Sequence, residues 1–325
     1  MELVCPAGTP AALRTAVDAG AHAIYCGFND ETNARNFPGL NFSRQDMARG
    51  IAYAHGKGAK VLVAINTFPR AGAETLWHRA VADADAAGAD AIILADIGLL
   101  AFARDHHPRP RRHVSVQAAA ANPQAIAFYT GEFGVKRVVL PRVLSVAEIA
   151  AINRQIDCET EVFVFGGLCV MAEGRCSLSS YVTGKSPNMN GVCSPASDVS
   201  YQTIGTSVVS RLGGFTIDQA SRDEPTPYPT LCKGCFKSGA YTGHVFAEPA
   251  SLDAAELIPA LAEAGVSALK LEGRQRSRAY VGNVVSTFRR AVDAYAAGKP
   301  IPAGQLQAMS EGQSTTAGAY VKTWR

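Results

Sequence analysis

Residues 2–27 read ELVCPAGTPAALRTAVDAGAHAIYCG and contain a strand, a helix and a second strand in succession. Residues 2–5 and 22–27 are short apolar runs typical of buried strands. Thr9 suits a helix N-cap and Pro10 the first helical position, so we expect a helix that runs to Gly20. A strand, a helix and a strand in this order predict two parallel strands of one sheet.

The same alternation continues along the chain. Ser43 with Asp46, and Ser145 with Glu148, resemble capping pairs at two further helix starts. Further strands are expected at residues 60–66, 90–96, 113–117, 137–140, 161–165 and 268–272. Helices are expected at residues 43–55, 73–87, 97–104, 123–129, 252–264 (capped by Ser251) and 277–297, with another after Ser145. Eight strands that alternate with helices predict an α/β fold, a (β/α)8 TIM-like barrel. The competitor, a doubly wound open sheet, is disfavoured because no G-x-G-x-x-G motif follows the first strand.

The spacing of the predicted strands also suggests the domain organisation. The barrel is expected over residues 1–298. Residues 166–250, glycine-rich and strand-poor by their sequence, are expected to form a cysteine-rich insertion after the seventh strand. Residues 299–325 are expected to form a C-terminal tail.

Composition bounds the class of protein. The chain has 325 residues, of which 47% are hydrophobic and 18% charged, enough apolar material for a large core. Its formal net charge of +3 gives no support for a general nucleic-acid or membrane-surface binder, so no nucleic-acid partner is expected. Neither a signal peptide nor a transmembrane segment is expected. The prediction is a cytoplasmic protein, whose reduced cysteines serve metal or catalytic roles rather than disulfides.

Four cysteines in the insertion, Cys169, Cys176, Cys193 and Cys232, are candidate metal ligands. Their wide, uneven spacing favours an iron–sulfur cluster over zinc, because zinc sites usually present paired C-x₂₋₄-C knuckles. Only Cys232 and Cys235 have that spacing, so Cys235 is either an alternative ligand or a bystander. The alternative is that the four cysteines bind no metal and act as small buried apolar residues. Core packing is the role expected of three other cysteines, Cys5, Cys26 and Cys158.

Polar residues follow the ends of several predicted strands. In a barrel, the residues just past the strand ends line the active-site mouth, where the insertion also begins. Asp96 and Glu272 have an alternative role, which is to cap the next helix or pair with a barrel arginine. The strand-end residues are Asn66, Asp96, Gln117, Arg142, Glu272 and Arg274.

Several motifs resemble the collagenase-like family once filed as peptidases of unknown catalytic type. They are residues 161–169 (EVFVFGGLC), residues 173–179 (EGRCSLS), residues 2–8 (ELVCPAG) and residues 269–274 (LKLEGR). The resemblance is strongest to the branch of the family that acts in oxygen-independent ubiquinone biosynthesis. Residues 113–117 (HVSVQ), 139–143 (VLPRV), 228–234 (YPTLCKG) and 309–312 (MSEG) carry it.

This resemblance implies a cofactor, a partner and substrates. It implies a [4Fe-4S] cluster on Cys169, Cys176, Cys193 and Cys232, and a heterodimer with a sister protein, UbiV. It also implies hydroxylation of a ubiquinone precursor with prephenate as the oxygen donor. Other branches hydroxylate RNA bases, which keeps an RNA-base hydroxylase as an alternative. In this chain Cys235 stands where the family commonly has a basic residue, which puts the fourth ligand in question.

Three residues are candidates for catalytic roles. A dicarboxylate donor such as prephenate needs cationic anchors, for which Arg142 and Arg274 are the candidates. Glu272 would serve as an acid or base if burial raised its pKa. The remaining alternatives are a peptidase, for which the sequence offers no clear nucleophile, and a non-catalytic protein with a structural cluster.

Overall fold

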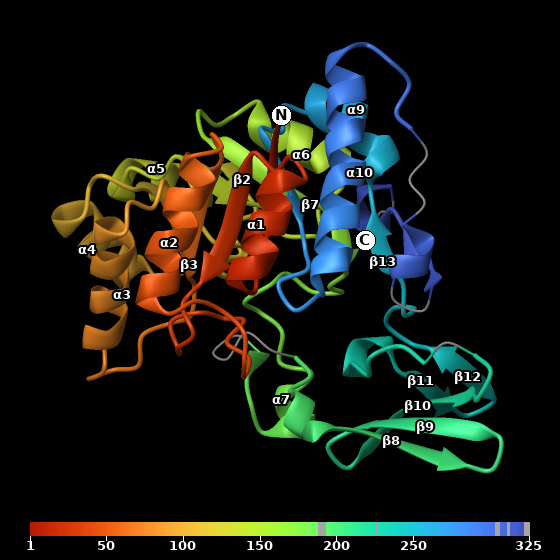
Figure 1. Ribbon diagram of the computed structural model, residues 1–325. Helices are drawn as coiled ribbons and strands as arrows, with labels where there is room; N and C mark the ends of the chain where they lie inside the picture. The colour runs from red at the N-terminus through yellow and green to blue at the C-terminus, as the bar shows by residue number, and fades with distance from the viewer. Residues whose placement is uncertain (188–192, 225, 303–305, 311–312, 322–325) are drawn as a thin grey trace.

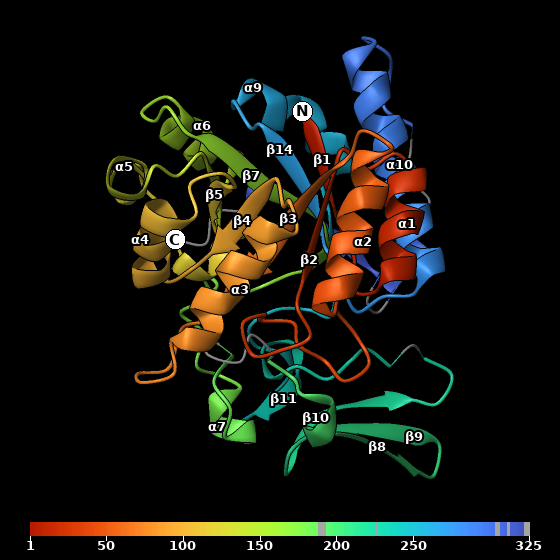
Figure 2. The same cartoon turned by 60° about the vertical axis from the view of Figure 1, so that its left-hand side comes forward.

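The computed structural model describes residues 1–187, 193–224, 226–302, 306–310 and 313–321. Eight parallel strands follow one another around a closed barrel, in which the last strand, β14, pairs with both β1 and β7 (Figures 1 and 2). The predicted TIM-like barrel is therefore confirmed. Its strands are β1 (Glu2–Pro6), β2 (Ala23–Gly27), β3 (Lys60–Ile65), β4 (Ala91–Leu94), β5 (Arg111–Val114), β6 (Arg137–Val139), β7 (Glu159–Gly167) and β14 (Ala268–Leu271).

Helices surround the barrel, and their starts follow the predicted caps. The Thr9 hydroxyl accepts a hydrogen bond from the Ala12 amide, and Ser145 with Glu148 forms a complete capping box. These helices are α1 (Pro10–Asp18), α2 (Arg44–His55), α3 (Thr75–Ala86), α4 (Ile97–His106), α5 (Pro123–Phe133), α6 (Val146–Asn153), α9 (Ile258–Glu263) and α10 (Arg278–Ala296), whereas the short α7 (Ser180–Thr183) belongs to the insertion. None of the helices in the described residues is long and apolar enough to cross a membrane.

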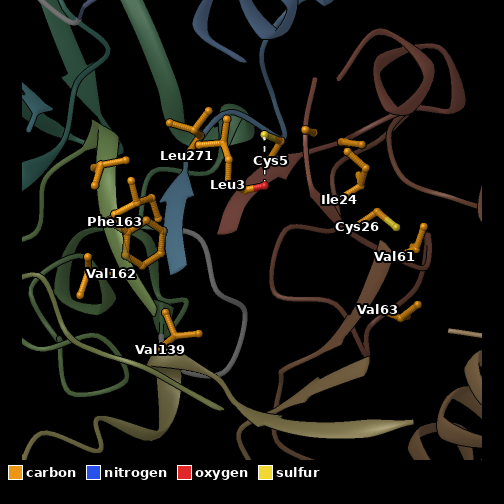
Figure 3. Packing of buried hydrophobic residues seen from close by; sticks show 14 of the residues in the cluster. Leu3, Cys5, Ile24, Cys26, Val61, Val63, Val139, Val162, Phe163 and Leu271 are labelled. Atoms are coloured by element: carbon orange, nitrogen blue, oxygen red, sulfur yellow. Dashed lines mark hydrogen bonds between the residues drawn. The ribbon is translucent and has the colours of Figure 1, made fainter. Parts of the chain in front are cut away.

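The main core lies between the strands and the surrounding helices. Figure 3 shows Leu3, Cys5, Ile24 and Cys26 within this packing, and all four are fully buried. Side chains alternate between the two faces of a strand. Leu3, Cys5, Ile24 and Cys26 therefore point outward to the helices, and Val4 and Tyr25, which lie between them in sequence, point into the barrel. Cys5 and Cys26 therefore act as small core residues, as predicted, and Cys158 packs against the same core from a half-buried position.

The insertion after β7 contains more strands than its sequence was expected to form. Two tight turns, at Gly205 and at Gly213-Gly214, join three antiparallel strands, and a separate two-stranded hairpin follows. Figures 1 and 2 place these strands together beyond one end of the barrel. The strands are β8 (Val199–Ile204), β9 (Ser207–Leu212), β10 (Phe215–Ser221), β11 (Cys235–Ser238) and β12 (Tyr241–His244). The expectation of a strand-poor segment is therefore wrong.

The predicted helix at residues 252–264 is also wrong at its start. Residues Ser251–Asp253 form β13, which pairs antiparallel with the end of β7 from Phe165 to Gly167. The helical part begins only at a 3-10 turn, Ala255–Leu257, which leads into α9. β7 is longer than its predicted range, and its free edge offers backbone partners that override the local helical signal.

Part of the predicted tail packs against the barrel. β15 (Thr315–Thr316) pairs with β13, and the Tyr320 hydroxyl donates a hydrogen bond to the Phe163 carbonyl at 2.5 Å. Tyr320 is almost fully buried. Residues 313–321 therefore brace β7, the strand that leads into the insertion.

Candidate functional site

A cleft opens at the carboxyl end of the barrel strands. It encloses about 970 Å³ of space, including its open mouth. Strands β2 to β7 and β14, or the loops that follow them, contribute its walls. Of the six polar residues predicted at strand ends, the structure brings five together here, namely Asn66, Gln117, Arg142, Glu272 and Arg274.

Asp96 does not line the described part of the cleft. Its Oδ1 accepts a hydrogen bond from the Leu99 amide at 2.8 Å, which makes Asp96 the N-cap of α4. The capping alternative is therefore the role that the structure assigns to this residue.

Arg142 is the centre of a buried ion cluster on one wall of the cleft. Its guanidinium stacks on the Phe163 ring, with Cζ 3.5 Å from the ring centre. Nη1 donates to Glu173, and Nη2 donates to Glu272 Oε2 at 3.0 Å. Nη1 also lies 3.9 Å from the Cys169 sulfur. Two carboxylates already balance this charge, so Arg142 is better suited to hold its neighbours in place than to bind an anion alone.

Glu272 lies between two arginines. Its Oε1 is 4.0 Å from Arg35 Nη2, whereas Arg142 contacts the other oxygen, Oε2. Burial raises the pKa of Glu272, but the charges of Arg142 and Arg35 together outweigh this effect. The net pKa therefore falls below its usual value. The condition set for acid catalysis, a pKa raised by burial, is therefore not met, and Glu272 is an ionised carboxylate near neutral pH. A Cβ at Gly166 would lie 2.5 Å from the Glu272 Cβ, so β7 requires glycine at this point.

Arg274 has a different environment. It is buried, and the described residues place no carboxylate within ion-pairing distance of it. Its Nη1 donates to Asn33 Oδ1 at 2.8 Å, and its Cζ lies 5.3 Å from the centre of the Tyr25 ring. Burial lowers the pKa of Arg274 to about 10, so it stays protonated at neutral pH. A buried guanidinium without a carboxylate partner is well suited to bind an anionic ligand.

Sequence reasoning missed several residues of the cleft. They are Tyr25, Arg35, Glu173, Lys270 and Arg276. With them the lining holds five cationic side chains and two carboxylates, so the cleft favours an anionic ligand. The signal for Lys270 was present, because a charged residue between two leucines of a barrel strand must point into the barrel.

The four candidate ligand cysteines all lie in the insertion, and none forms a disulfide. Burial raises the pKa of Cys169, Cys193 and Cys232. The Cys193 thiol adds to the shift at Cys169, and the Cys176 thiol adds to the shifts at Cys193 and Cys232. The four thiols therefore lie within electrostatic reach of one another. Cys235, by contrast, begins β11 and pairs with His244 on β12.

The thiols do not converge on a single point. Within the described residues, no three cysteine, histidine or acidic side chains are close enough to hold a metal ion. Residues 188–192, which precede Cys193, lie outside the described part of the chain. The donor set itself fits an iron–sulfur cluster, because it offers four free thiols from loops and one short turn, Leu231–Lys233.

Comparisons with known proteins identify the family. The chain matches peptidase family U32 over residues 8–322. It is 33% identical to tRNA hydroxylation protein P of Escherichia coli (strain K12), covering 95% of this chain and 71% of that protein. It is also 33% identical to tRNA hydroxylation protein P1 of Bacillus subtilis (strain 168), covering 91% of this chain and 64% of that protein.

A third relative acts on another class of RNA. The chain is 30% identical to the 23S rRNA 5-hydroxycytidine C2501 synthase of Escherichia coli (strain K12), covering 90% of this chain. It spans only 39% of that protein, and about two thirds of the two tRNA relatives. Because the family match covers nearly all of the sequence, the chain belongs to peptidase family U32.

Proposed function

We propose that this protein is an oxygen-independent hydroxylase whose insertion cysteines hold a [4Fe-4S] cluster beside the cleft. The observation that supports this most is the position of Arg142, which lines the cleft and lies 3.9 Å from the Cys169 sulfur. A group bound by the cysteines would therefore share a wall with a ligand in the cleft. Relatives of this chain are named for the hydroxylation of RNA, which supports the same class of reaction.

The ligands proposed for the cluster are Cys169, Cys176, Cys193 and Cys232. Burial raises the pKa of three of these thiols, so they are protonated when no metal is bound, and binding would release their protons. The loops would draw the four sulfurs together as the cluster binds. When bound, the cluster would supply the electron transfer that ring hydroxylation without oxygen requires.

The cationic cleft supports a dicarboxylate as the oxygen donor, and prephenate is the donor that we propose. Arg274 is the better anchor of the two predicted arginines, because Arg142 already carries two carboxylates. Arg142 would then position Glu272 and the Cys169 loop. Glu272, ionised and bound to two arginines, is placed to accept a proton rather than to donate one.

For the hydroxylated substrate we favour a ubiquinone precursor. The motifs described above resemble UbiU, a member of the ubiquinone branch, which acts as a heterodimer with UbiV. The near-balanced charge of the chain, +3 over 325 residues, also suits a small apolar ring better than a polyanion. UbiV is therefore the proposed partner.

An RNA base is the second candidate substrate. Its support is the set of curated relatives, which are 30–33% identical and named for tRNA and rRNA hydroxylation. This chain spans only part of those proteins, so whatever the rest of their length contributes to RNA binding does not carry over from the match.

A product assay separates the two candidates. The cluster-loaded protein, with UbiV and prephenate under anaerobic conditions, is incubated either with a ubiquinone precursor or with unmodified tRNA and rRNA. Mass spectrometry then detects one added oxygen, and Cys193→Ala serves as the control without an intact cluster site. We expect product from the quinone precursor alone. Product from RNA alone would establish the second candidate, and no product from either substrate would contradict the hydroxylase.

A further inference from the structure

The interior of the barrel is divided into an apolar half and an ionic half. Inward side chains from β1 to β4, with one from β14, form an apolar cluster of Val4, Ala23, Tyr25, Leu62, Ala64, Ala91, Ile93 and Ala268. Beside this cluster, β6, β7 and β14 each place one buried charged residue in the interior, namely Arg137, Glu161 and Lys270. Each of these three charged residues is at most 5% exposed. These charged residues therefore lie inside the barrel, away from solvent.

These three residues form a connected column. Lys270 Nζ donates to Glu161 Oε1 at 2.5 Å, and Arg137 Nη1 donates to Glu161 Oε2 at 3.2 Å. At the far end, Arg137 Nη1 lies 2.6 Å from Glu2 Oε2. Buried ion pairs contribute little net stability, and apolar side chains of similar size usually fill a barrel interior at least as well. Stability alone therefore does not explain why a lysine stands at this position.

Lys270 is the end of the column that reaches the cleft. It lines the cleft, and its Nζ lies 3.8 Å from the centre of the Tyr25 ring. The Tyr25 hydroxyl donates to the Leu271 carbonyl at 2.8 Å, which fixes the ring beneath the ammonium. An ammonium has three N–H donors, and Glu161 is the one hydrogen-bond acceptor that the described residues give it. Donors remain for a ligand.

A second cation lies over the same ring. The Arg274 Cζ is 5.3 Å from the Tyr25 centre, and this guanidinium also lacks a carboxylate partner among the described residues. Lys270 and Arg274 are therefore close enough to contact one small molecule at two points. Two cations over one ring favour a ligand with two anionic groups, one for each cation.

We propose that Lys270 is a ligand-binding residue, which binds one carboxylate of a small dicarboxylate while Arg274 binds the other. Glu161 is the positioning residue that holds the Lys270 ammonium at the floor of the cleft. This inference rests on the proposed function, in which such a dicarboxylate is the oxygen donor. It adds a ligand contact at the floor of the cleft, made by Lys270, and an orientation of the ligand between Lys270 and Arg274. It also gives a reason for the buried column of charged residues.

The test compares two probes on two variants by calorimetric titration of the cluster-loaded protein. Prephenate carries two carboxylates, and phenylpyruvate carries one. Lys270→Met and Arg274→Met should each weaken prephenate binding by about tenfold or more, because each removes a charged hydrogen bond. Phenylpyruvate binding should fall in only one of the two variants, since its single carboxylate meets only one cation. Lys57→Met, an exposed lysine remote from the cleft, is the matched control and should bind both probes like the wild type.

Other results would overturn the inference. Prephenate affinity unchanged in Lys270→Met would remove Lys270 from the site, and equal losses of both probes in both variants would indicate general damage. If Lys270→Met does not fold, Lys270→Gln removes the charge at similar length and should show the same loss. Binding of neither probe by the wild type would also overturn the inference, whereas the hydroxylase proposal is judged separately by product formation.

Discussion

The cysteines of the barrel and those of the insertion have opposite surroundings. Cys5 and Cys26 are fully buried among apolar side chains of the core. Cys169 and Cys193 keep solvent-exposed surface, yet enough protein surrounds their thiols for burial to raise their pKa. The insertion thiols also raise one another's pKa, whereas the pKa of Cys5 is raised by burial and lowered only by the charge of Lys270. The same residue type thus serves packing in one region and, in our proposal, metal ligation in the other.

The largest expected effect separates these two sets of cysteines. Cys176→Ala or Cys193→Ala removes a proposed ligand and should abolish cluster binding, because a cluster needs its thiolates. Cys5→Ala and Cys158→Ala should leave the iron content unchanged. Iron and acid-labile sulfide per chain, measured after anaerobic purification, check this. Equal iron loss in all four variants would undo the distinction.

A backbone substitution tests how the insertion is seated on the barrel. Gly174 has φ +78°, and a Cβ there would lie 1.9 Å from the Gln117 carbonyl oxygen. Gly174→Ala should displace the adjacent Cys176 loop and lower the iron content severalfold. Gly39 has nearly the same φ, +77°, but open space around it, so Gly39→Ala carries the backbone strain of about 1 kcal/mol without the clash. Similar iron contents in the two variants would show that the contact with Gln117 does not hold the loop.

A third substitution affects the barrel and not the insertion. Burial raises the pKa of Glu2, but Arg137 and Lys60 together outweigh this effect, so the net pKa lies below the usual value of 4.5. A lowered carboxyl pKa stabilises the fold above pH 4.5 and loses that contribution as the pH falls through the folded-state pKa. Glu2→Gln should therefore cost about 2–3 kcal/mol in urea unfolding at pH 7, and less at pH 3.5. A cost that does not change with pH, or a lower iron content, would argue against this account.

The smallest expected effect concerns a core cysteine. The Cys26 sulfur lies 3.5 Å from the Met47 sulfur in the packed core. Cys26→Ala removes one buried atom and should cost about 1 kcal/mol with no change in iron content. Burial raises the pKa of Cys26 to about 12, so its thiol should also resist alkylation in the native protein. Rapid alkylation, followed by mass spectrometry, would place Cys26 outside the core.

The barrel could be predicted because its signals are local. Each strand is a short apolar run, and caps such as Thr9 and Ser145 mark where helices start. The start of the helix after Ser251 could not be predicted, because β13 forms only where the end of β7 provides a partner. The insertion strands are an intermediate case, because the turn glycines Gly205 and Gly213 are visible in the sequence, whereas most side chains of β8 are exposed and give no apolar run.

The candidate site was predicted less completely than the fold. Strand ends identified Arg142, Glu272 and Arg274, because topology brings the ends of parallel strands together. Which arginine is paired and which is not depends on Glu173, a residue of a distant loop, so the sequence could not distinguish them. The sign of the Glu272 pKa shift depends on the same long-range contacts.

The central claim is that the insertion carries an iron–sulfur cluster beside the cleft. Anaerobic purification of the wild-type protein, with iron and sulfide quantification and spectra before and after dithionite, tests it most directly. We predict about four irons and four sulfides per chain, as for a [4Fe-4S] cluster, with broad absorbance that bleaches on reduction. Zinc without sulfide would contradict the claim and make the four cysteines a structural metal site.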